Sequence, residues 1–241
     1  MITVEHLHKS FGNHTVLHDI SFTMNSGSVT AVLGPNGSGK TTFMKCLLGL
    51  VRPQKGSITI NGIHANGNGA YRSMLGYMPQ IARFPENLTA NEVFDMVRDI
   101  RGITETTENN LIDFFELREH CNKPLRSLSG GSRQKVSAVA ALMFSPQVLL
   151  LDEPTAGLDP ITSGRLKDYV LEQKQKGTTV VLTSHILSEV EELADHIIYL
   201  LDGTVYYNGT LTQLKATTGE STLERALASL LLTARATGVL N

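Results

Sequence analysis

Residues 34–41 constrain the fold of this chain more than any other segment, because they read Gly-Pro-Asn-Gly-Ser-Gly-Lys-Thr. The run matches the pattern GxxxxGK[ST], and it lies between the apolar residues 29–33 and the helical composition of residues 41–50. Glycines let consecutive backbone N–H groups turn toward one centre, which makes a concave site for an anion. The N-terminus of the following helix adds the positive end of its dipole. The segment therefore predicts a cradle for nucleotide phosphates.

The polar side chains of this cradle have distinct expected roles. We expect the ammonium group of Lys40 to bind the β- and γ-phosphates of ATP, and the hydroxyl of Thr41 to be a ligand of Mg²⁺. The residues expected to contact the nucleotide are Gly34, Pro35, Asn36, Gly37, Ser38, Gly39, Lys40, Thr41 and Thr42. A glycine-rich turn that only caps a helix is the alternative, and the complete motif in a strand–loop–helix setting argues against it.

A second apolar run, residues 148–151, ends in the adjacent carboxylates Asp152 and Glu153. Burying charge is costly, so a strand that is buried on both faces rarely ends in two acids for packing reasons. We expect Asp152 to reach the Mg²⁺ held by Thr41. Because side chains alternate along a strand, we expect Glu153 to face elsewhere and to act as the general base on the attacking water.

The remaining sequence predicts an α/β fold. Short apolar runs with period-two patterning in residues 1–33 indicate antiparallel strands before the buried strand 29–33. Between about 88 and 145 the apolar spacing becomes helical. The other expected elements are helices at 91–100, 109–117, 131–144, 161–175 and 187–194, strands at 56–61 and 179–183, a surface loop at 62–69, a hairpin of 197–201 with 204–207, and an amphipathic helix that carries Leu223, Ala226, Leu227, Leu230 and Leu231.

Composition excludes several classes of protein. The chain has 241 residues and a net charge of -2, which argues against a protein that binds nucleic acid. Cys46 and Cys121 lie in no CxxC or Cys/His cluster, so we expect neither a disulfide framework nor a zinc site. No apolar run reaches the roughly 18 residues that a membrane span needs, and the N-terminus has no signal-peptide pattern. We therefore expect a cytoplasmic protein that contacts a membrane only through a partner.

The segment Leu128-Ser-Gly-Gly131 narrows the family. It resembles LSGGQ, the signature of ABC ATPases, and it precedes the acidic strand end, as in that family. Ser132 replaces the glutamine of the signature, which puts little in doubt because the phosphate contacts come from the serine and glycines before it. Other family marks fall in order along residues 1–215: Phe11 resembles the aromatic that stacks on adenine, Gln80 the Q-loop glutamine, Ala156-Gly-Leu-Asp159 the D-loop and His185 the switch histidine.

This resemblance implies a single ABC ATPase domain over residues 1–241. Its parts would be a P-loop NTPase (RecA-like) core, an antiparallel β layer, an inserted helical subdomain at about 81–145 and a helical tail at about 211–241. The implied function is ATP hydrolysis that powers transport of an unidentified substrate through a separate transmembrane permease. The chain would lie peripherally on the cytoplasmic face of the cell membrane. Bacterial exporter-type systems are the most similar branch.

The resemblance also implies a homodimer in which two subunits sandwich two ATP molecules head to tail. Ser129, Gly130 and Gly131 would contact the γ-phosphate that Lys40 of the other subunit holds, and Asp159 would couple the two sites. Physical chemistry is compatible with this role, since Ser129 opens a helix whose N-terminus suits a phosphate. A serine before two glycines is also an ordinary helix cap, and that local explanation stays open.

Four further residues have roles that rest on the resemblance. Gln80 would bind Mg²⁺ or water and transmit the nucleotide state to the helical insert, and His185 would contact the γ-phosphate and position Glu153. Phe11 would stack on adenine with Val16 near the base, although an aromatic residue beside a strand is more often packing.

Other functions fit the sequence less well. A non-transport ABC ATPase that works on nucleic acid or ribosomes would be expected to have long coiled-coil inserts or two ATPase units, and this chain has neither. A nucleotide-binding scaffold without turnover conflicts with the presence of Glu153 and His185. Another kind of P-loop kinase leaves residues 128–131 unexplained.

Overall fold

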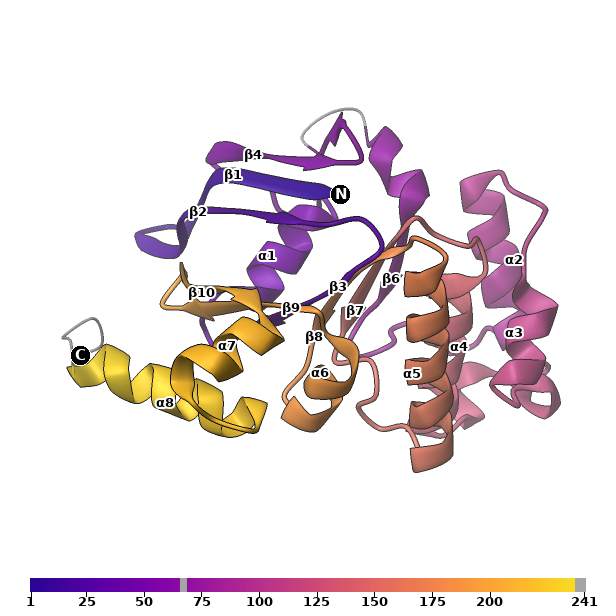
Figure 1. Ribbon diagram of the computed structural model, residues 1–241. Coiled ribbons are helices and arrows are strands. Elements are labelled where there is room, and N and C mark those ends of the chain that lie inside the picture. The colour runs from indigo at the N-terminus through magenta and orange to yellow at the C-terminus, as the bar shows by residue number, and fades with distance from the viewer. Residues whose placement is uncertain (66–68, 237–241) are drawn as a thin grey trace.

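The computed structural model describes residues 1–65 and 69–236 of the chain. Its two β-sheets form separate layers, with helices between and beside them (Figure 1). Residues 66–68 of the predicted surface loop and residues 237–241 of the predicted tail lie outside the described residues.

The outer sheet is antiparallel, as its patterning predicted. Its strand order is β2 (His14–Met24), β1 (Ile2–Phe11), β4 (Lys55–Ile60) and β5 (Ile63–His64). β1 and β2 are longer than the predicted apolar runs, because register shifts let the pairing continue through polar positions. The loop prediction for residues 62–69 is wrong at Ile63 and His64, which form β5, whereas the hairpin turn that the pair Asn61-Gly62 predicts is confirmed. Asn61 and Gly62 both have positive φ, and this tight turn pairs Ile63 with Ile60.

The core sheet is parallel except at one edge. Its strand order is β10 (Thr204–Thr210), β9 (His196–Leu201), β3 (Val29–Leu33), β8 (Thr179–Thr183), β7 (Val148–Asp152) and β6 (Leu75–Met78). Only β10 runs antiparallel to its neighbour among these described strands, and it forms the predicted hairpin with β9. β6 is missing from the predicted elements, because its run of four residues is short and contains Gly76.

Eight α-helices are present in the described residues. They are α1 (Lys40–Leu47), α2 (Ala90–Arg101), α3 (Glu108–Phe114), α4 (Gly130–Leu142), α5 (Pro160–Gln175), α6 (Leu187–Leu193), α7 (Leu211–Thr218) and α8 (Leu223–Ala236). α1 ends three residues before the predicted position 50, because Gly49 takes φ 68° and Leu50 N–H closes the last turn on Lys45 O at 2.9 Å. α3 stops before the predicted position 117, since Glu116 has a φ of 52°.

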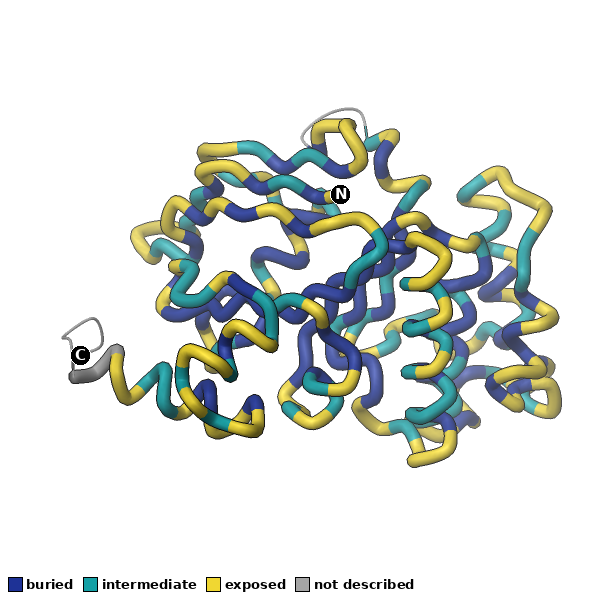
Figure 2. Tube along the Cα trace, in the orientation of Figure 1, coloured by how far each residue is buried: buried dark blue, intermediate teal, exposed yellow. Residues whose placement is uncertain are grey.

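The core sheet is buried on both faces (Figure 2). Leu149 and Leu151 of β7 face a hydrophobic core that includes residues of α2 to α8. Val148 and Leu150 face a second core, which α1 and the outer sheet close from the other side. Gly76 of β6 allows close helix packing, because a Cβ there would lie 2.3 Å from a carbonyl oxygen of α4. Packing on both faces therefore fixes the strand ends from which the site is built.

The C-terminal amphipathic helix is confirmed as α8. Its Leu223, Ala226 and Leu227 are buried in the same core as the helices of residues 90–193, and Leu230 and Leu231 pack against that core with partial exposure. α2, α3 and α4 all lie in residues 81–145. The division of the chain into a core, a helical subdomain and a tail stays a prediction.

Candidate active site

The phosphate loop joins β3, whose five residues are all buried, to α1. Three of its residues, Gly34, Gly37 and Gly39, have positive φ, which is the left-handed region that favours glycine. A side chain at Gly34 is excluded by space as well, because a Cβ there would lie 2.1 Å from the Leu200 carbonyl oxygen. The loop thus curves tightly against the core sheet and leads directly into α1 at Lys40.

Lys40 lies folded over this loop. Its Nζ donates to the carbonyl oxygens of Gly34 (2.7 Å) and Pro35 (2.9 Å). Burial lowers the pKa of the Lys40 ammonium, and the nearby carboxylates of Glu153 and Asp152 oppose that shift by favouring its charged form. The cation is therefore held above the loop, within the field of two acids, where a bound phosphate can replace its carbonyl partners.

Most of the predicted residues meet at one cavity of about 340 Å³ beside the loop. Those that line it are Val16, Asn36, Gly37, Gly39, Lys40, Thr41, Thr42, Gln80, Asp152, Glu153 and His185. Gly34, Pro35 and Ser38 shape the loop without lining the cavity, while Phe11, Ser129, Gly130, Gly131 and Asp159 lie outside its walls. The cavity thus joins the loop to the ends of β6, β7 and β8.

Glu153 is the first residue after β7. Its side chain is only 10% exposed, and its Oε1 lies 3.2 Å from Nε2 of His185. The backbone N–H of His185 donates to Oε2 at 3.1 Å, so both carboxylate oxygens are engaged by one residue. Strand alternation, which the sequence suggested, does not orient this side chain. Glu153 instead has a φ of 50°, a strained conformation for an L-residue, and this turn of the backbone separates it from Asp152.

Two residues of the site are absent from the sequence prediction. Thr183 ends the fully buried strand β8, and its Oγ1 donates to Asp152 Oδ1 at 2.6 Å while its carbonyl accepts from Glu153 N–H at 3.1 Å. A threonine directly after the apolar run 180–182 was the available signal. His14 also lines the cavity, beside Val16. No pattern in the sequence distinguishes His14 from the other histidines of the outer sheet.

The donor set of the cavity fits Mg²⁺. Asp152, Thr41 and Gln80 offer carboxylate, hydroxyl and amide oxygens, the hard ligands that this ion prefers. Asp152 is fixed as an acceptor by the hydroxyl of Thr183. Residues 1–65 and 69–236 contain no group of three or more His, Cys, Asp or Glu side chains that could hold a metal alone.

Gln80 connects this cavity to α4. It is exposed and lies two residues beyond β6. The carbonyl oxygen of the preceding residue, Pro79, accepts from Nε2 of Gln134, a buried residue of α4, at 3.4 Å. A displacement of the Gln80 backbone would therefore reach the helix that begins at the Ser-Gly-Gly segment.

Ser129 caps α4 at an exposed position. Its Oγ accepts from Ser132 N–H at 3.1 Å, which confirms the local capping explanation. Ser129 and Gly130 are both exposed, so the N-terminus of α4 is open to a partner. Gly131, in contrast, packs on the D-loop segment, since a Cβ there would lie 3.0 Å from the Gly157 carbonyl oxygen.

Asp159 caps α5 in the same surface. It accepts from Thr162 N–H (2.9 Å) and Thr162 Oγ1 (2.6 Å), and these hydrogen bonds hold the pKa of its carboxyl below the usual value. Lys135 of α4 lies 3.9 Å away, which links the two motif segments electrostatically. Both predicted motifs thus occur side by side, away from the cavity of their own chain.

Phe11 ends β1 and pairs across the hairpin with His14. Its ring is largely exposed, and Lys9 Nζ lies 4.8 Å from the ring centroid. His14, its partner in the strand pairing, lines the nucleotide cavity together with Val16, whereas Phe11 does not.

Comparison with known proteins decides the family. A model described as ABC transporter matches residues 17–156, more than half of the chain. The chain belongs to the ABC transporter family. The lantibiotic transport ATP-binding protein SrtF of Streptococcus pyogenes is 35% identical over 205 residues, 85% of this chain and 89% of the relative. The linearmycin resistance ATP-binding protein LnrL of Bacillus subtilis is 32% identical over 229 residues, 92% of this chain and 73% of the relative.

Solved structures agree with this assignment. The ATP binding subunit of an ABC transporter aligns with a TM-score of 0.89 and 31% identity, covering 96% of this chain and 99% of that subunit. The ATP-binding cassette MJ0796, in a dimeric structure with ADP and phosphate, aligns with a TM-score of 0.78 and 25% identity over 88% of this chain and 99% of that cassette.

Several predictions from the sequence are thereby confirmed. This ABC protein is an ATPase with a P-loop NTPase fold, and it powers transport with a separate membrane partner. Within residues 1–65 and 69–236, no helix has the length and apolar character that crossing a bilayer requires.

Proposed function

We propose that the cavity beside the phosphate loop binds ATP with Mg²⁺ and that Glu153, oriented by His185, removes the proton of the attacking water. One observation carries this proposal. A nearly buried carboxylate accepts the backbone N–H of His185, lies 3.2 Å from the imidazole of the same residue, and lines the same cavity as Lys40 of the phosphate loop. A positioned carboxylate within reach of a phosphate site is what general-base hydrolysis requires.

The chemistry follows from the atoms at the site. A water near Glu153 would give its proton to a carboxylate oxygen while its own oxygen attacks the γ-phosphorus. The bond from that phosphorus to the bridging oxygen breaks, and ADP keeps the bridging oxygen. Lys40 would offset the negative charge that develops on the phosphates, and His185 would hold Glu153 and contact the γ-phosphate. Mg²⁺, held by Thr41, Asp152 and Gln80, would neutralise charge on the β- and γ-phosphates when bound.

The complete site would contain residues from two copies of the chain. The N-terminus of α4, with Ser129 and Gly130, is exposed and lies outside the cavity of its own chain. A helix N-terminus binds phosphate well, so it would serve the γ-phosphate of a second copy. Asp159 and Gly131 are in the same surface and would lie at the contact. The dimeric cassette MJ0796 supports this arrangement by likeness.

A mixing experiment tests the shared site. Ser129→Arg should lower ATP hydrolysis at least about 100-fold without removing ATP, because a bulky cation would occupy the place of the partner's phosphate. Mixed with inactive Lys40→Ala, it should recover part of the activity, since one of the two sites in a mixed dimer would have both halves intact. The measurement is phosphate release at several mixing ratios.

Ser127→Arg is the matched control, since Ser127 is also exposed and its hydroxyl donates to Pro124 O in its own turn. Hydrolysis that persists in Ser129→Arg, or the absence of any recovery in the mixture, would contradict the composite site.

The membrane partner would dock in a groove between the core and residues 81–145. This groove of about 450 Å³ is lined by Leu48, Leu50, Arg72, Leu75, Tyr77, Pro79, Arg83, Phe84, Val97, Arg101, Ser137, Ala140 and Ala141. Residues 80–92 would form one lip of this groove. Within that segment Phe84 lines the groove and Pro85 does not. Leu50, which is 69% exposed, supports the proposal because an exposed leucine beside an apolar groove suits a protein partner.

Leu50→Asp should reduce capture of the native membrane partner roughly 10-fold or more, because docking would bury an unpaired charge. ATP hydrolysis by the isolated chain should stay unchanged, since Leu50 lies outside the nucleotide cavity. Ile100→Asp, at a position that is 76% exposed and outside the groove, is the matched control. Full co-purification of Leu50→Asp with the partner would refute this docking site.

Location and direction complete the proposal. The chain would be a single ATPase domain held peripherally at the cytoplasmic face of the cell membrane by its permease. Residues 81–145 would form a helical subdomain that moves with nucleotide state through Gln80. Export is the direction we favour, because the names of SrtF and LnrL refer to lantibiotic transport and linearmycin resistance.

A further inference from the structure

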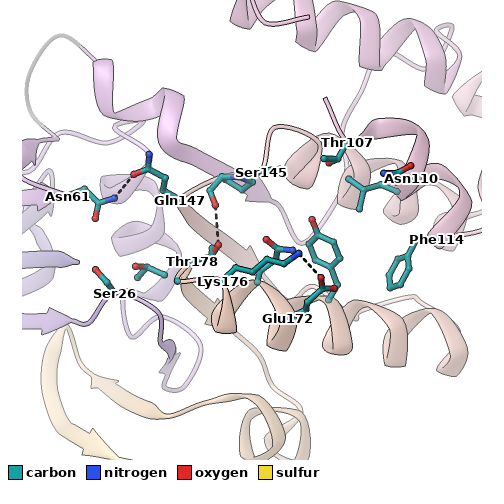
Figure 3. Close-up of a pocket in the computed structure, with 16 residues that line it drawn as sticks. Ser26, Asn61, Thr107, Asn110, Phe114, Ser145, Gln147, Glu172, Lys176 and Thr178 are labelled. Atoms are coloured by element: carbon teal, nitrogen blue, oxygen red, sulfur yellow. Dashed lines mark hydrogen bonds and ion pairs between the residues drawn. The ribbon is translucent and has the colours of Figure 1, made fainter. Parts of the chain in front are cut away.

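A second cavity, of about 540 Å³, lies at the far end of two strands that carry the catalytic residues (Figure 3). Gln147 just before β7 and Thr179 at the start of β8 line it, whereas Asp152 and Thr183 end the same strands at the nucleotide cavity. The strands rise about 3.3 Å per residue, so the two ends are roughly 13 Å apart. Of the described residues, none lines both cavities. This is a separate site.

One wall of this second cavity is aromatic. Phe114 at the end of α3 and Tyr169 of α5 have ring centroids 6.0 Å apart and planes inclined by 56°. The ring of Phe114 also meets the buried Phe115 edge-on at 5.0 Å, so it is held although Phe114 is 37% exposed. Burial raises the pKa of the Tyr169 phenol to about 12, which keeps the hydroxyl protonated and able to donate.

Two hydrogen bonds from Arg165 fix the spacing between α3 and α5, which carry the two aromatic rings. Arg165 of α5 donates to the carbonyl oxygen of Phe114 at 2.9 Å and to Glu116 Oε1 at 2.7 Å. These bonds tie the end of α3 to α5 directly beside the aromatic wall. The cavity is therefore formed before any ligand arrives, as is usual for small-molecule sites, and its volume lies in their range of about 300–1,000 Å³.

Four amide side chains line the cavity. Asn61 and Gln147 are paired, because Asn61 Nδ2 donates to Gln147 Oε1 at 3.0 Å (Figure 3). The other two, Asn110 and Gln173, have no side-chain hydrogen-bond partner within the described part of the chain. The charged groups cancel, because Lys176 Nζ donates to Glu172 Oε1 at 2.6 Å (Figure 3). A ligand would therefore meet an aromatic surface, two amides that each offer a donor and an acceptor, and no net charge.

We propose that this cavity binds an uncharged planar aromatic molecule that carries an amide or lactam group. The ring would pack on Phe114 and Tyr169. The amide would exchange hydrogen bonds with Asn110 and Gln173, which can each donate and accept. Such a ligand contacts α3 of residues 81–145 and α5 of the core together, so its binding would be linked to any movement between them.

Indole-3-carboxamide is a suitable probe, because the chain contains no tryptophan and indole fluorescence would come from the probe alone. Titrating the whole chain into the probe should raise its fluorescence anisotropy, with a dissociation constant on the order of 0.1–1 mM for a ligand of this size. Saturating ADP should leave this binding in place, since the nucleotide cavity is separate.

Three variants locate the probe. Phe114→Ala should weaken binding about 10-fold through loss of the aromatic contact, and Asn110→Leu about 3-fold or more through loss of the amide partner. Both residues are exposed enough for the chain to fold without them, which thermal unfolding would verify. Ile100→Ala, on the exposed surface of α2 outside the cavity, should change binding less than 2-fold.

Each outcome bears on the proposal. Saturable binding that ADP spares and that both cavity variants weaken would support it. Absence of saturable binding, displacement by ADP, or equal affinity in Phe114→Ala and the unaltered chain would overturn it.

Discussion

Replacing Glu153 with glutamine is expected to slow ATP hydrolysis by about 10²–10⁴-fold, the usual contribution of a general base. The amide has the shape of the carboxylate and can still accept the hydrogen bond from the His185 backbone, which the carboxylate now receives at 3.1 Å. It cannot take a proton from water. Nucleotide binding should therefore survive, and ATP should hold the variant as a dimer. Single-turnover phosphate release and size-exclusion chromatography with ATP would measure both effects.

The control for this substitution is Glu119→Gln, because Glu119 is exposed and lies outside the nucleotide cavity. It should hydrolyse ATP at the rate of the unaltered chain. Unchanged turnover in Glu153→Gln would mean that another group removes the proton, and His185 would be the next candidate.

Removal of the Lys40 ammonium should weaken ATP binding by at least about 100-fold. A hydrogen bond from a charged group contributes roughly 1.5–3 kcal/mol, and a factor of ten in affinity corresponds to about 1.4 kcal/mol. The Lys40→Ala variant should nevertheless fold, because Gly34 and Pro35 lie in a loop whose carbonyl groups can accept from water once Nζ is gone. Equilibrium binding of a fluorescent ATP analogue is the measurement.

Lys45→Ala provides the matched comparison on the same helix. Lys45 is exposed in the last turn of α1 and does not line the cavity, so its removal should leave ATP affinity within about 2-fold. Equal affinity of Lys40→Ala and Lys45→Ala would show that the loop does not hold the triphosphate as proposed.

The sequence predicted the parts of the fold and site that are encoded locally. Residues 34–41 specify their loop through glycines whose positive φ other residues adopt less readily. The apolar runs 148–151 and 180–182 form most of β7 and β8, whose faces are both buried. The acidic pair at 152–153 follows such a strand directly. Local pattern and tertiary environment agree at these places, so the meeting of Lys40 with Asp152 and Glu153 could be predicted.

What the sequence did not predict depends on contacts between distant segments. β6 has only four residues, and one of them is Gly76, which allows α4 to pack closely. The strand is therefore defined by its pairing with β7 and not by its own sequence pattern. Thr183 matters because it hydrogen-bonds Asp152, 31 positions away along the chain. The direction of Glu153 arises from one backbone torsion angle and not from strand alternation. Hydrophobic periodicity and short sequence motifs do not specify these contacts or this torsion angle.

The left-handed backbone conformation of Glu153 lowers the stability of the fold at the residue that we propose as the general base. An L-residue with a side chain loses roughly 1 kcal/mol or more in that conformation, whereas glycine adopts it freely. Glycine at position 153 would therefore relieve this strain and would remove the proposed general base in the same step. A gain in stability and a loss of turnover are expected to come together at this one residue.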